Sequence, residues 1–432
     1  MIFMCRTHYI KDAVSQTGKK VKLAGWAHEV RDKGKMKFVL LRDKTGIIQI
    51  FAKEGVMSQE DFEKLSCPKE TVLSVEGEIK ESKIAKSGVE LIPSSVEILG
   101  KLSAKVPFEL TGKVPADLDI RLDHRSVDLR RPETNAIFSI KSRVAHSFRN
   151  YLFEQGFDEI HSTCIVSAAT EGGADLFPVK YFEKDAYLAQ SPQLYKQMAV
   201  IGGLDKVFMT MPVYRAEKHN TLEHLNEVLQ MDVEMGFCTD AEALDALEGT
   251  FLHILKSVSE NCKPQLETLG TELKVPKKVQ RHTYTSLIEK LNSHDTKIEW
   301  GEDFNREHEA KLNEILGEDA YIITQWPTKI RAFYSMPNDD EKTCKAYDLI
   351  YKGLEISSGA QRIHTPELLE KQLKFHGCNP EDFKFYVDAF RVGAPPHAGW
   401  SIGIERLTMK ICGLHNIREA CMFPRDRHRL TP

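Results

Sequence analysis

Arg215 and Glu217 are the residues whose types and spacing point most directly to chemistry. Apolar and polar residues alternate through VFMTMPVYRAE, residues 207–217, which predicts a strand with both charged side chains on one face. Arginine offers a planar fork to phosphate oxygens, and glutamate accepts hydrogen bonds from an amine. A polar loop to His224 and a second strand, EVLQMDVEM, follow. Alone, such a pair most often marks a solvated strand face.

A glycine-dense segment near the C-terminus carries another arginine. APPHAGWSIGIERL, residues 394–407, predicts a Pro-Pro turn, a strand and then a helix with Arg406 in its first turn, ending at Gly413. We expect Gly399 and Gly403 to let a flat ligand lie close to the backbone. This segment is therefore a candidate wall of a ligand site.

A third segment, YDLIYKGLEISSGAQRIH at residues 347–364, combines acids with an arginine. Asp348 and Glu355 fall on strand-like stretches, and Arg362 follows a Ser-Ser-Gly turn. Acidic strand residues usually face water, so this segment alone decides little. The conjunction of all three segments indicates a shared site.

The order of these segments resembles the class II aminoacyl-tRNA synthetases, and within them the aspartyl enzymes of archaeal and eukaryotic type. YRAE at 214–217 is similar to the family's motif 2, and GIER at 403–406 to motif 3. TEGGADLFPV at 170–179 and SPQLYKQ at 191–197 resemble its amino-acid-binding loops. The resemblance covers essentially the whole chain, and several signatures in the right order make it specific. It implies an α+β fold, with an N-terminal OB-fold β-barrel followed by a class II catalytic domain, an antiparallel sheet flanked by helices.

The resemblance also implies a reaction and its residues. Activating an amino acid with ATP brings several anions together, so positioning and charge neutralisation carry the catalysis and no general base is needed. Arg215 and Arg406 are the implied catalytic residues. The implied ATP-binding residues are Arg215, Glu217, Glu223, His224, Leu225, Glu355, Gly403, Ile404, Glu405 and Arg406. Mg²⁺, which takes hard oxygen ligands, would be held by Asp348, Glu355 and Ser358. The second step would pass the aminoacyl group to the 3′ end of tRNA.

Amino-acid selection is implied to depend on two cations, Lys196 and Arg362, which match the family's side-chain carboxylate binders. The ammonium end matches Glu171, Ser191, Gln193 and Asp232. Asparaginyl enzymes carry an uncharged residue where Lys196 stands. A buried cation without a partner costs several kcal/mol, so we expect L-aspartate to be accepted and asparagine rejected.

The N-terminal region has the pattern of a small barrel. Five strand candidates lie at 21–30, 36–43, 46–53, 70–80 and 89–99, with a short helix at Ser58–Leu65 between the third and fourth. This pattern predicts an OB-fold, whose open face commonly binds single-stranded nucleic acid. Residues 1–102 hold 18 basic against 14 acidic residues although the whole chain has a net charge of −4, so the basic excess is local.

The resemblance places anticodon recognition on this barrel, through His28, Arg31, Phe38, Gln49, Lys86 and Glu90. Phe38 would stack on a base, whereas the residues alone favour a place for it in the barrel core. His28 stands where strict archaeal enzymes carry Trp, which implies that tRNA(Asn) is charged as well as tRNA(Asp). Lys86 matches a Lys of the strict enzymes and implies the opposite, so the sequence leaves the choice open.

The wider composition sets the remaining expectations. We predict an OB-fold domain at 1–102, a proline-containing hinge without sustained period at 103–132, and the catalytic domain at 133–432. The nine scattered cysteines predict reduced thiols, and no apolar run suits a membrane or a secretion signal, so we expect a cytoplasmic protein. The family implies a homodimer, although Thr163 replaces the proline of motif 1.

Two other classes of function compete with an aspartate ligase for tRNA. An asparaginyl enzyme or an amide-forming paralogue is opposed by Lys196 and, for a paralogue without tRNA, by the barrel. A non-catalytic tRNA-binding protein is opposed by the complete set of Arg215, Glu217, Glu355 and Arg406.

Overall fold

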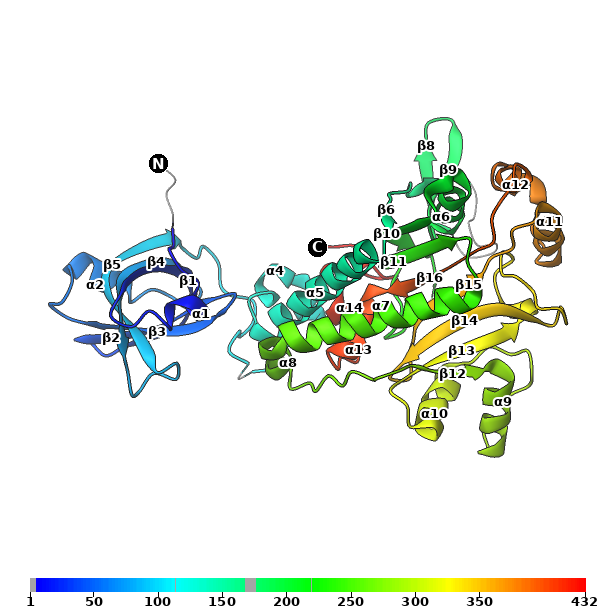
Figure 1. Ribbon diagram of the computed structural model, residues 1–432. Coiled ribbons are helices and arrows are strands. Elements are labelled where there is room, and N and C mark those ends of the chain that lie inside the picture. Colours follow the sequence, from blue (N-terminus) through cyan, green and yellow to red (C-terminus); the bar gives the residue numbers. More distant parts are fainter. Residues whose placement is uncertain (1–4, 113, 168–175, 219) are drawn as a thin grey trace. The chain divides into compact units, whose positions relative to one another are not determined.

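The computed structural model describes residues 5–112, 114–167, 176–218 and 220–432 (Figure 1). Its chain forms two compact units, Met1–Asn135 and Ala136–Thr431. The expected hinge at 103–132 falls within the first unit. The three-part division with boundaries at 102 and 132 therefore stays a prediction.

The first unit contains a closed five-stranded barrel in the order β1-β2-β3-β5-β4, which confirms the predicted OB-fold. Its strands are β1 (Lys20–Asp32), β2 (Met36–Asp43), β3 (Gly46–Lys53), β4 (Val72–Glu81) and β5 (Val89–Gly100). Strand β3 pairs with β5 in parallel, and the other pairs are antiparallel. Alternate residues such as Val39, Ile50 and Leu91 are buried inside, so the intervening side chains face outward. The short helices are α1 (Ile10–Ala13) and α2 (Gln59–Lys64), and α2, the helix predicted at Ser58–Leu65, is capped by Ser58.

The segment predicted as an irregular hinge is more ordered than its pattern indicated. It includes α3 (Leu118–Asp123) and α4 (Arg125–Asp128). Asp128 is fully buried and accepts hydrogen bonds from Arg121 and Arg125, at 2.8 and 2.6 Å. Ion pairs between residues several positions apart stabilise this segment, and hydrophobic periodicity does not report them.

The second unit is built on an eight-stranded sheet in the order β12-β13-β14-β15-β16-β11-β10-β6. Its six central strands are antiparallel, as predicted, but β6 and β12 pair in parallel at the two edges, so the sheet is mixed. The strands are β6 (Asp158–Glu159), β10 (Lys206–Tyr214), β11 (Glu227–Gly236), β12 (Gln280–Thr283), β13 (Ala320–Pro327), β14 (Thr343–Tyr351), β15 (Glu355–Gln361) and β16 (His397–Gly403). A separate small sheet comprises β7 (Ile165–Val166), β9 (Lys184–Leu188) and β8 (Pro178–Tyr181).

Three helices cover one face of the large sheet: α5 (Pro132–Glu154), α7 (Asp240–Asn261) and α13 (Ile404–Ile411) (Figure 1). Their apolar stripes pack on the odd-numbered residues of β11, including Val233, and on Trp400 of β16. Helix α7 begins at a capping box of Thr239 and Glu242, which the sequence Thr-Asp-Ala-Glu at 239–242 indicates. Because side chains alternate along a strand, the even-numbered polar residues of β11 project from the opposite face.

The remaining helices surround this core. They are α6 (Gln193–Ala199), α8 (Lys263–Leu269), α9 (Tyr284–Ser293), α10 (Arg306–Leu316), α11 (Pro366–Phe375), α12 (Lys384–Arg391) and α14 (Ile417–Ala420). Among the residues that the model describes, no helix is both long and apolar enough to cross a membrane. All nine cysteines are free thiols, as predicted.

Candidate functional site

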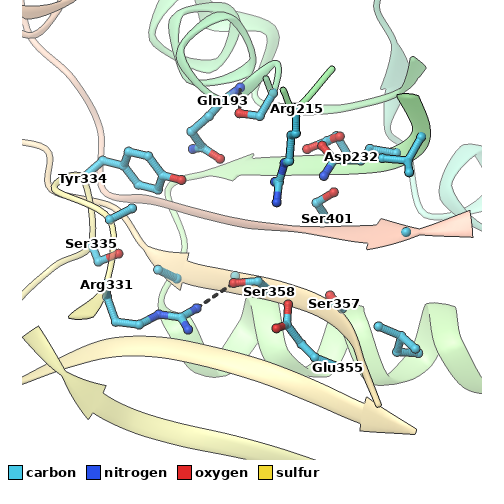
Figure 2. A pocket seen from close by; sticks show the side chains of 18 of the residues that line it. Gln193, Arg215, Asp232, Arg331, Tyr334, Ser335, Glu355, Ser357, Ser358 and Ser401 are labelled. Atoms are coloured by element: carbon cyan, nitrogen blue, oxygen red, sulfur yellow. Dashed lines mark hydrogen bonds between the residues drawn. The ribbon is translucent and has the colours of Figure 1, made fainter. Parts of the chain in front are cut away.

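A cavity of about 610 Å³ opens on the face of the large sheet that the three helices leave uncovered (Figure 2). Strands β11, β15 and β16, helix α6 and the segments after β10 and β13 contribute its walls. The predicted residues that line it are Ser191, Gln193, Lys196, Arg215, Glu217, Glu223, His224, Leu225, Asp232, Glu355, Ser358, Arg362, Gly403, Glu405 and Arg406. Segments far apart in the sequence are thus brought to one place.

Two described residues that were assigned to the active site, Ile404 and Asp348, do not line the cavity. The side chain of Ile404 is buried in the core under α13, so its predicted nucleotide contact lacks a side chain in the cavity. Asp348 is buried in β14, beside Ser358 of the neighbouring strand β15. Glu171 lies outside the described residues.

Arg215 and Glu217 lie just beyond the end of β10 at Tyr214, so the prediction that a strand carries both was wrong. Asn226 ends this loop by donating to the backbone oxygens of Arg215 and Glu217, at 2.7 and 3.0 Å. The loop base is therefore held by an amide side chain, and the two charged side chains leave from irregular backbone.

Arg406 is fixed by contacts with two walls of the cavity. Its guanidinium donates to the backbone oxygen of Glu355 at 2.9 Å and to Nε2 of His224 at 3.1 Å. Burial, followed by the nearby Arg406 charge, lowers the pKa of His224. A neutral His224 is the form that accepts this hydrogen bond.

Lys196, Asp232, Glu234 and Arg362 form a buried chain of alternating charge at one end of the cavity, here called the amino-acid end. Lys196 Nζ lies 2.9 Å from Asp232 Oδ1 and 3.5 Å from Glu234 Oε2. Arg362 binds Glu234 through two hydrogen bonds of 2.9 and 3.1 Å. All four side chains are at most 3% exposed, so these interactions are little screened by water.

Glu234 was not singled out in the sequence, although it connects both cations. Burial alone would raise its pKa, but Arg362 and then Lys196 lower it below the usual value. A signal was present, because Gln230, Asp232 and Glu234 occupy every second position of an otherwise apolar strand. Three polar residues on one face of a buried strand indicate a polar cavity.

Gly399 plays a different role from the one predicted. It lies opposite Glu234 across the β11–β16 ladder, and a side chain at 399 would collide with the Glu234 carboxylate and the Val233 carbonyl. The missing side chain makes room for a buried carboxylate and not for a flat ligand. Gly403 does line the cavity.

Several acidic groups, Glu309, Asp348 and Glu355, lie near one another on the other side of the cavity, here called the nucleotide end. Asp348 accepts two hydrogen bonds from Arg331, at 2.7 and 2.8 Å, and burial raises its pKa to about 6 despite this pairing. Burial and then the charge of Glu355 raise the pKa of the half-buried Glu309 to about 8. The carboxylates thus crowd one another here.

The predicted Mg²⁺ ligands fit that ion in their chemistry. Asp348, Glu355 and Ser358 supply only oxygen atoms, and a divalent cation would relieve the crowding of acids. Asp348 and Ser358 face each other across β14 and β15, and both are bonded to Arg331. Within the described part of the chain, no three His, Cys, Asp or Glu residues form a metal-binding group by themselves.

Glu405 has a structural partner as well as a place in the cavity wall. Its carboxylate binds Lys141 Nζ of α5 at 2.7 Å and accepts the backbone amide of Leu229 at 3.0 Å. These contacts hold α13 against β11.

Several polar lining residues escaped the sequence analysis. They are Gln230, Lys329, Arg331, Tyr334, Ser335, Ser357, His376 and Ser401. Gln230 and Ser401 could have been identified in the sequence, because each lies two residues from a predicted site residue on the same strand, Asp232 and Gly403. The segment 329–335 offered no comparable pattern.

A second candidate site lies on the outer face of the barrel. Arg31, Phe38 and Phe51 are direct neighbours across β1, β2 and β3, and the two rings stack at a centroid distance of 5.0 Å. Gln49 lies two residues from Phe51 and donates to Glu90 at 2.8 Å. Phe38 is half-buried on this outer face and is not in the barrel core, contrary to what the residues alone favoured. Phe51 is an additional aromatic residue that strand alternation from Gln49 could have identified.

His28 and Lys86 occupy different settings. His28 is the extra residue of a bulge in β1, and its Nδ1 lies 2.6 Å from Nη1 of Arg42. Arg42 in turn pairs with the buried Glu70 at 2.8 Å. Burial, followed by Arg42, lowers the pKa of His28. Lys86 is exposed in the β4–β5 loop.

Comparison with known families accounts for most of the chain. Residues 117–427 match the family described as tRNA synthetases class II (D, K and N), and residues 21–99 match the OB-fold nucleic acid binding domain. A relative from Methanopyrus kandleri, named aspartate–tRNA(Asp/Asn) ligase, is 47% identical over 99% of this chain and 100% of its own length. One from Pyrococcus abyssi, named aspartate–tRNA(Asp) ligase, is 46% identical with the same coverage.

Solved structures give the same family. Asparaginyl-tRNA synthetase from Pyrococcus horikoshii, complexed with asparaginyl-adenylate, aligns with a TM-score of 0.94 at 32% identity, over 99% of this chain and 100% of that one. Aspartyl-tRNA synthetase from Entamoeba histolytica aligns with a TM-score of 0.88 at 32% identity, over 99% and 92%.

Proposed function

The chain belongs to the class II tRNA synthetases for aspartate, lysine and asparagine, and we propose that it is an aspartate–tRNA ligase. It activates L-aspartate with ATP to give aspartyl-adenylate and pyrophosphate. It then transfers the aspartyl group to the 3′ end of tRNA(Asp). The names of the relatives with 46 and 47% identity support this substrate.

The two buried cations of the amino-acid end are the observation that carries the choice of aspartate. Lys196 and Arg362 are each paired with a resident carboxylate, and both line the cavity. They can therefore donate further hydrogen bonds to the side-chain carboxylate of aspartate. Asparagine offers an amide instead, which would replace a charge-assisted hydrogen bond by a weaker neutral one in a place largely closed to water.

The nucleotide end supplies the groups that activation requires. Arg215 is placed to neutralise the α-phosphate and the attacking carboxylate, and Arg406 to bind the nucleotide from the other wall. Neutral His224 orients the Arg406 guanidinium. Mg²⁺ held by Asp348, Glu355 and Ser358 would neutralise phosphate charge when it is bound with ATP.

ATP–pyrophosphate exchange with aspartate and with asparagine, each varied separately, tests the proposal. Aspartate is expected to support exchange at least a hundredfold more efficiently, a difference of about 2.7 kcal/mol. Preference for asparagine would identify an asparaginyl enzyme. Exchange with neither amino acid, at a nucleotide concentration that binds, would identify a non-catalytic tRNA-binding protein.

We further propose that the enzyme charges tRNA(Asn) as well as tRNA(Asp). Seven of the relatives carry names with both tRNAs, and that of Pyrococcus abyssi names tRNA(Asp) alone. His28 fills less space than the Trp of strict enzymes, and a gap supplies neither a clash nor an unpaired polar group against the wrong base.

Charging of purified tRNA(Asp) and tRNA(Asn) transcripts tests this choice. Similar efficiencies are expected for wild type, and His28→Trp should shift the preference toward tRNA(Asp). A wild-type preference of a hundredfold or more would contradict relaxed recognition and leave the ligase assignment intact. Lys86→Ala, measured in the same assay, shows whether the exposed lysine contributes to discrimination between tRNA(Asp) and tRNA(Asn). Phe38→Ala should weaken tRNA binding by ~1 to 3 kcal/mol without changing aspartate activation.

We propose a cytoplasmic homodimer. Phe153 of α5 is 54% exposed and Ile165 of β7 is 43% exposed, beside the motif 1 region. Thr163 binds the backbone of Ile165 through its hydroxyl, so the residue that replaces proline has a local partner. Sedimentation equilibrium of wild type and Phe153→Glu tests the assembly, and a wild-type monomer at micromolar concentration would contradict it.

A further inference from the structure

Arg331 is the side chain in the cavity with the most direct contacts to the proposed metal ligands, and the sequence did not indicate it. It follows the 3-10 turn Thr328–Ile330 after β13. Nη1 donates to Asp348 Oδ2 at 2.8 Å, and Nη2 donates to Asp348 Oδ1 at 2.7 Å. Nη2 also donates to Ser358 Oγ at 2.6 Å, the contact that Figure 2 shows as a dashed line. One guanidinium therefore contacts two of the three proposed Mg²⁺ ligands.

The surroundings hold this guanidinium in place. Asp348 and Ser358 are direct partners across β14 and β15, which puts both oxygens within reach of one planar fork. The Arg331 Cζ atom lies 4.9 Å from the ring centre of Trp326. The arginine side chain is 16% exposed, and the Asp348 side chain is 3% exposed. The ion pair is therefore stronger than one on the surface.

We propose that Arg331 is a resident cation that competes with the divalent ion for Asp348 and Ser358. This inference rests on the proposed function only in taking these residues as the Mg²⁺ ligands. Both oxygens of Asp348 already bind the guanidinium, and a metal ion entering beside it would meet a positive charge at close range. In the nucleotide-free protein, Arg331 balances the buried carboxylate and lowers the affinity for a free divalent ion.

This arrangement favours binding of the metal together with the nucleotide over binding of the metal alone. ATP adds several negative charges, which attract both the ion and Arg331. The guanidinium would then turn toward phosphate oxygens, which would free Asp348 and Ser358 to hold the metal. Arg331 is thus a positioning residue for the metal ligands and not a ligand itself.

Binding of Mn²⁺ to the nucleotide-free, full-length protein tests the competition. Titrations followed by the electron paramagnetic resonance of free Mn²⁺ at pH 8.5 compare wild type with Arg331→Met. The proposal expects binding at least tenfold tighter in the variant and an intermediate affinity for Arg331→Lys, which keeps the charge but loses the fork. Equal or weaker Mn²⁺ binding in Arg331→Met would overturn the proposal. Such a result would mean that the arginine only supports the structure and does not compete with the ion for Asp348 and Ser358.

Two controls connect the effect to this site. Arg281→Met removes another arginine that pairs with carboxylates, Asp245 and Glu248, and should not change Mn²⁺ binding. Adding Asp348→Asn to Arg331→Met should abolish the gain, and a gain that persists would overturn the proposal. Circular dichroism verifies folding, and Arg331→Lys alone decides if the Met variant does not fold. Aspartate-dependent exchange of wild type, measured in parallel, tests the proposed function separately.

Discussion

The two ends of the cavity differ in how much of their charge is balanced before a ligand arrives. At the amino-acid end, Lys196, Asp232, Glu234 and Arg362 are mutually paired and almost inaccessible to water. At the nucleotide end, acids crowd one another until burial and repulsion raise the pKa of Glu309 to about 8. The first end is preorganised, whereas the second is completed by its ligand.

This difference matches the tasks of the two ends. A preorganised, charge-balanced pocket discriminates between similar small molecules, because any mismatch leaves a buried charge without its partner. A site whose carboxylates repel one another before the ligand arrives is stabilised when a cation and a polyanion bind together. Substitutions at each end should therefore have different kinds of effect.

Glu234→Gln should have the largest effect, because it breaks the preorganised end at its centre. Lys196 and Arg362 would lose a shared anionic partner, and the free energy of unfolding should fall by about 3 to 5 kcal/mol. Urea unfolding measures the change. Asp245→Asn, which affects an ion pair at a side chain that is 74% exposed, is the control and should change stability by less than ~1 kcal/mol. Similar small effects of both changes would mean that the buried chain is not preorganised.

Arg406→Ala should affect the other end without a comparable loss of stability. It removes a charge that counters phosphate anions, so adenylate formation should slow by about 3 kcal/mol of transition-state free energy, roughly a hundredfold or more. Aspartate-dependent exchange measures this loss. The exposed Arg391, changed to Ala, is the control. Exchange within a few-fold of wild type would contradict the assignment of Arg406.

Lys196→Leu sharpens the comparison by asking which substrate depends on the buried cation. The Michaelis constant for aspartate should rise far more than that for ATP, because a substrate carboxylate would lose ~2 kcal/mol or more of interaction. Exchange kinetics with each substrate varied in turn provide both constants. Equal changes in the two constants would make Lys196 a structural residue.

Glu309→Gln should have the smallest effect of the four at pH ~5, and its effect grows as the pH rises. The pKa of Glu309 is about 8, above the ordinary carboxyl value, so the folded protein keeps this proton to a higher pH than the unfolded chain. Its contribution to stability is complete below pH ~4.5 and is lost as the pH rises toward 8. The variant stays neutral and should exceed wild type by about 3 to 5 kcal/mol at pH 9. Parallel pH profiles of unfolding for both proteins would contradict this expectation.

Much of this architecture could be predicted from local sequence patterns. Strand alternation located the barrel, and Thr239 with Glu242 marked the start of α7, because both features depend on neighbouring residues. Motif order brought the distant segments around Arg215 and Arg406 to one cavity.

The parts that could not be predicted depend on pairing between distant strands. Arg331 has no periodic context, and its contact with Asp348 follows only from the folding of β13 beside β14. The end of β10 before Arg215 is similarly decided by Asn226, eleven residues later, through its hydrogen bonds across the loop. The alternation of apolar and polar residues continues to Glu217, so it does not show that the strand ends at Tyr214.

Gly399 links the chemistry of the amino-acid end to the evolution of the protein. The space beside it is filled by the Glu234 carboxylate and the Val233 carbonyl, so even one added methyl group requires the two strands to shift. A lineage that retains Glu234 therefore retains glycine at this position. A lineage that changes its amino-acid specificity by replacing Glu234 still meets the Val233 carbonyl. Substitution of Gly399 is therefore costly whichever residue stands at position 234.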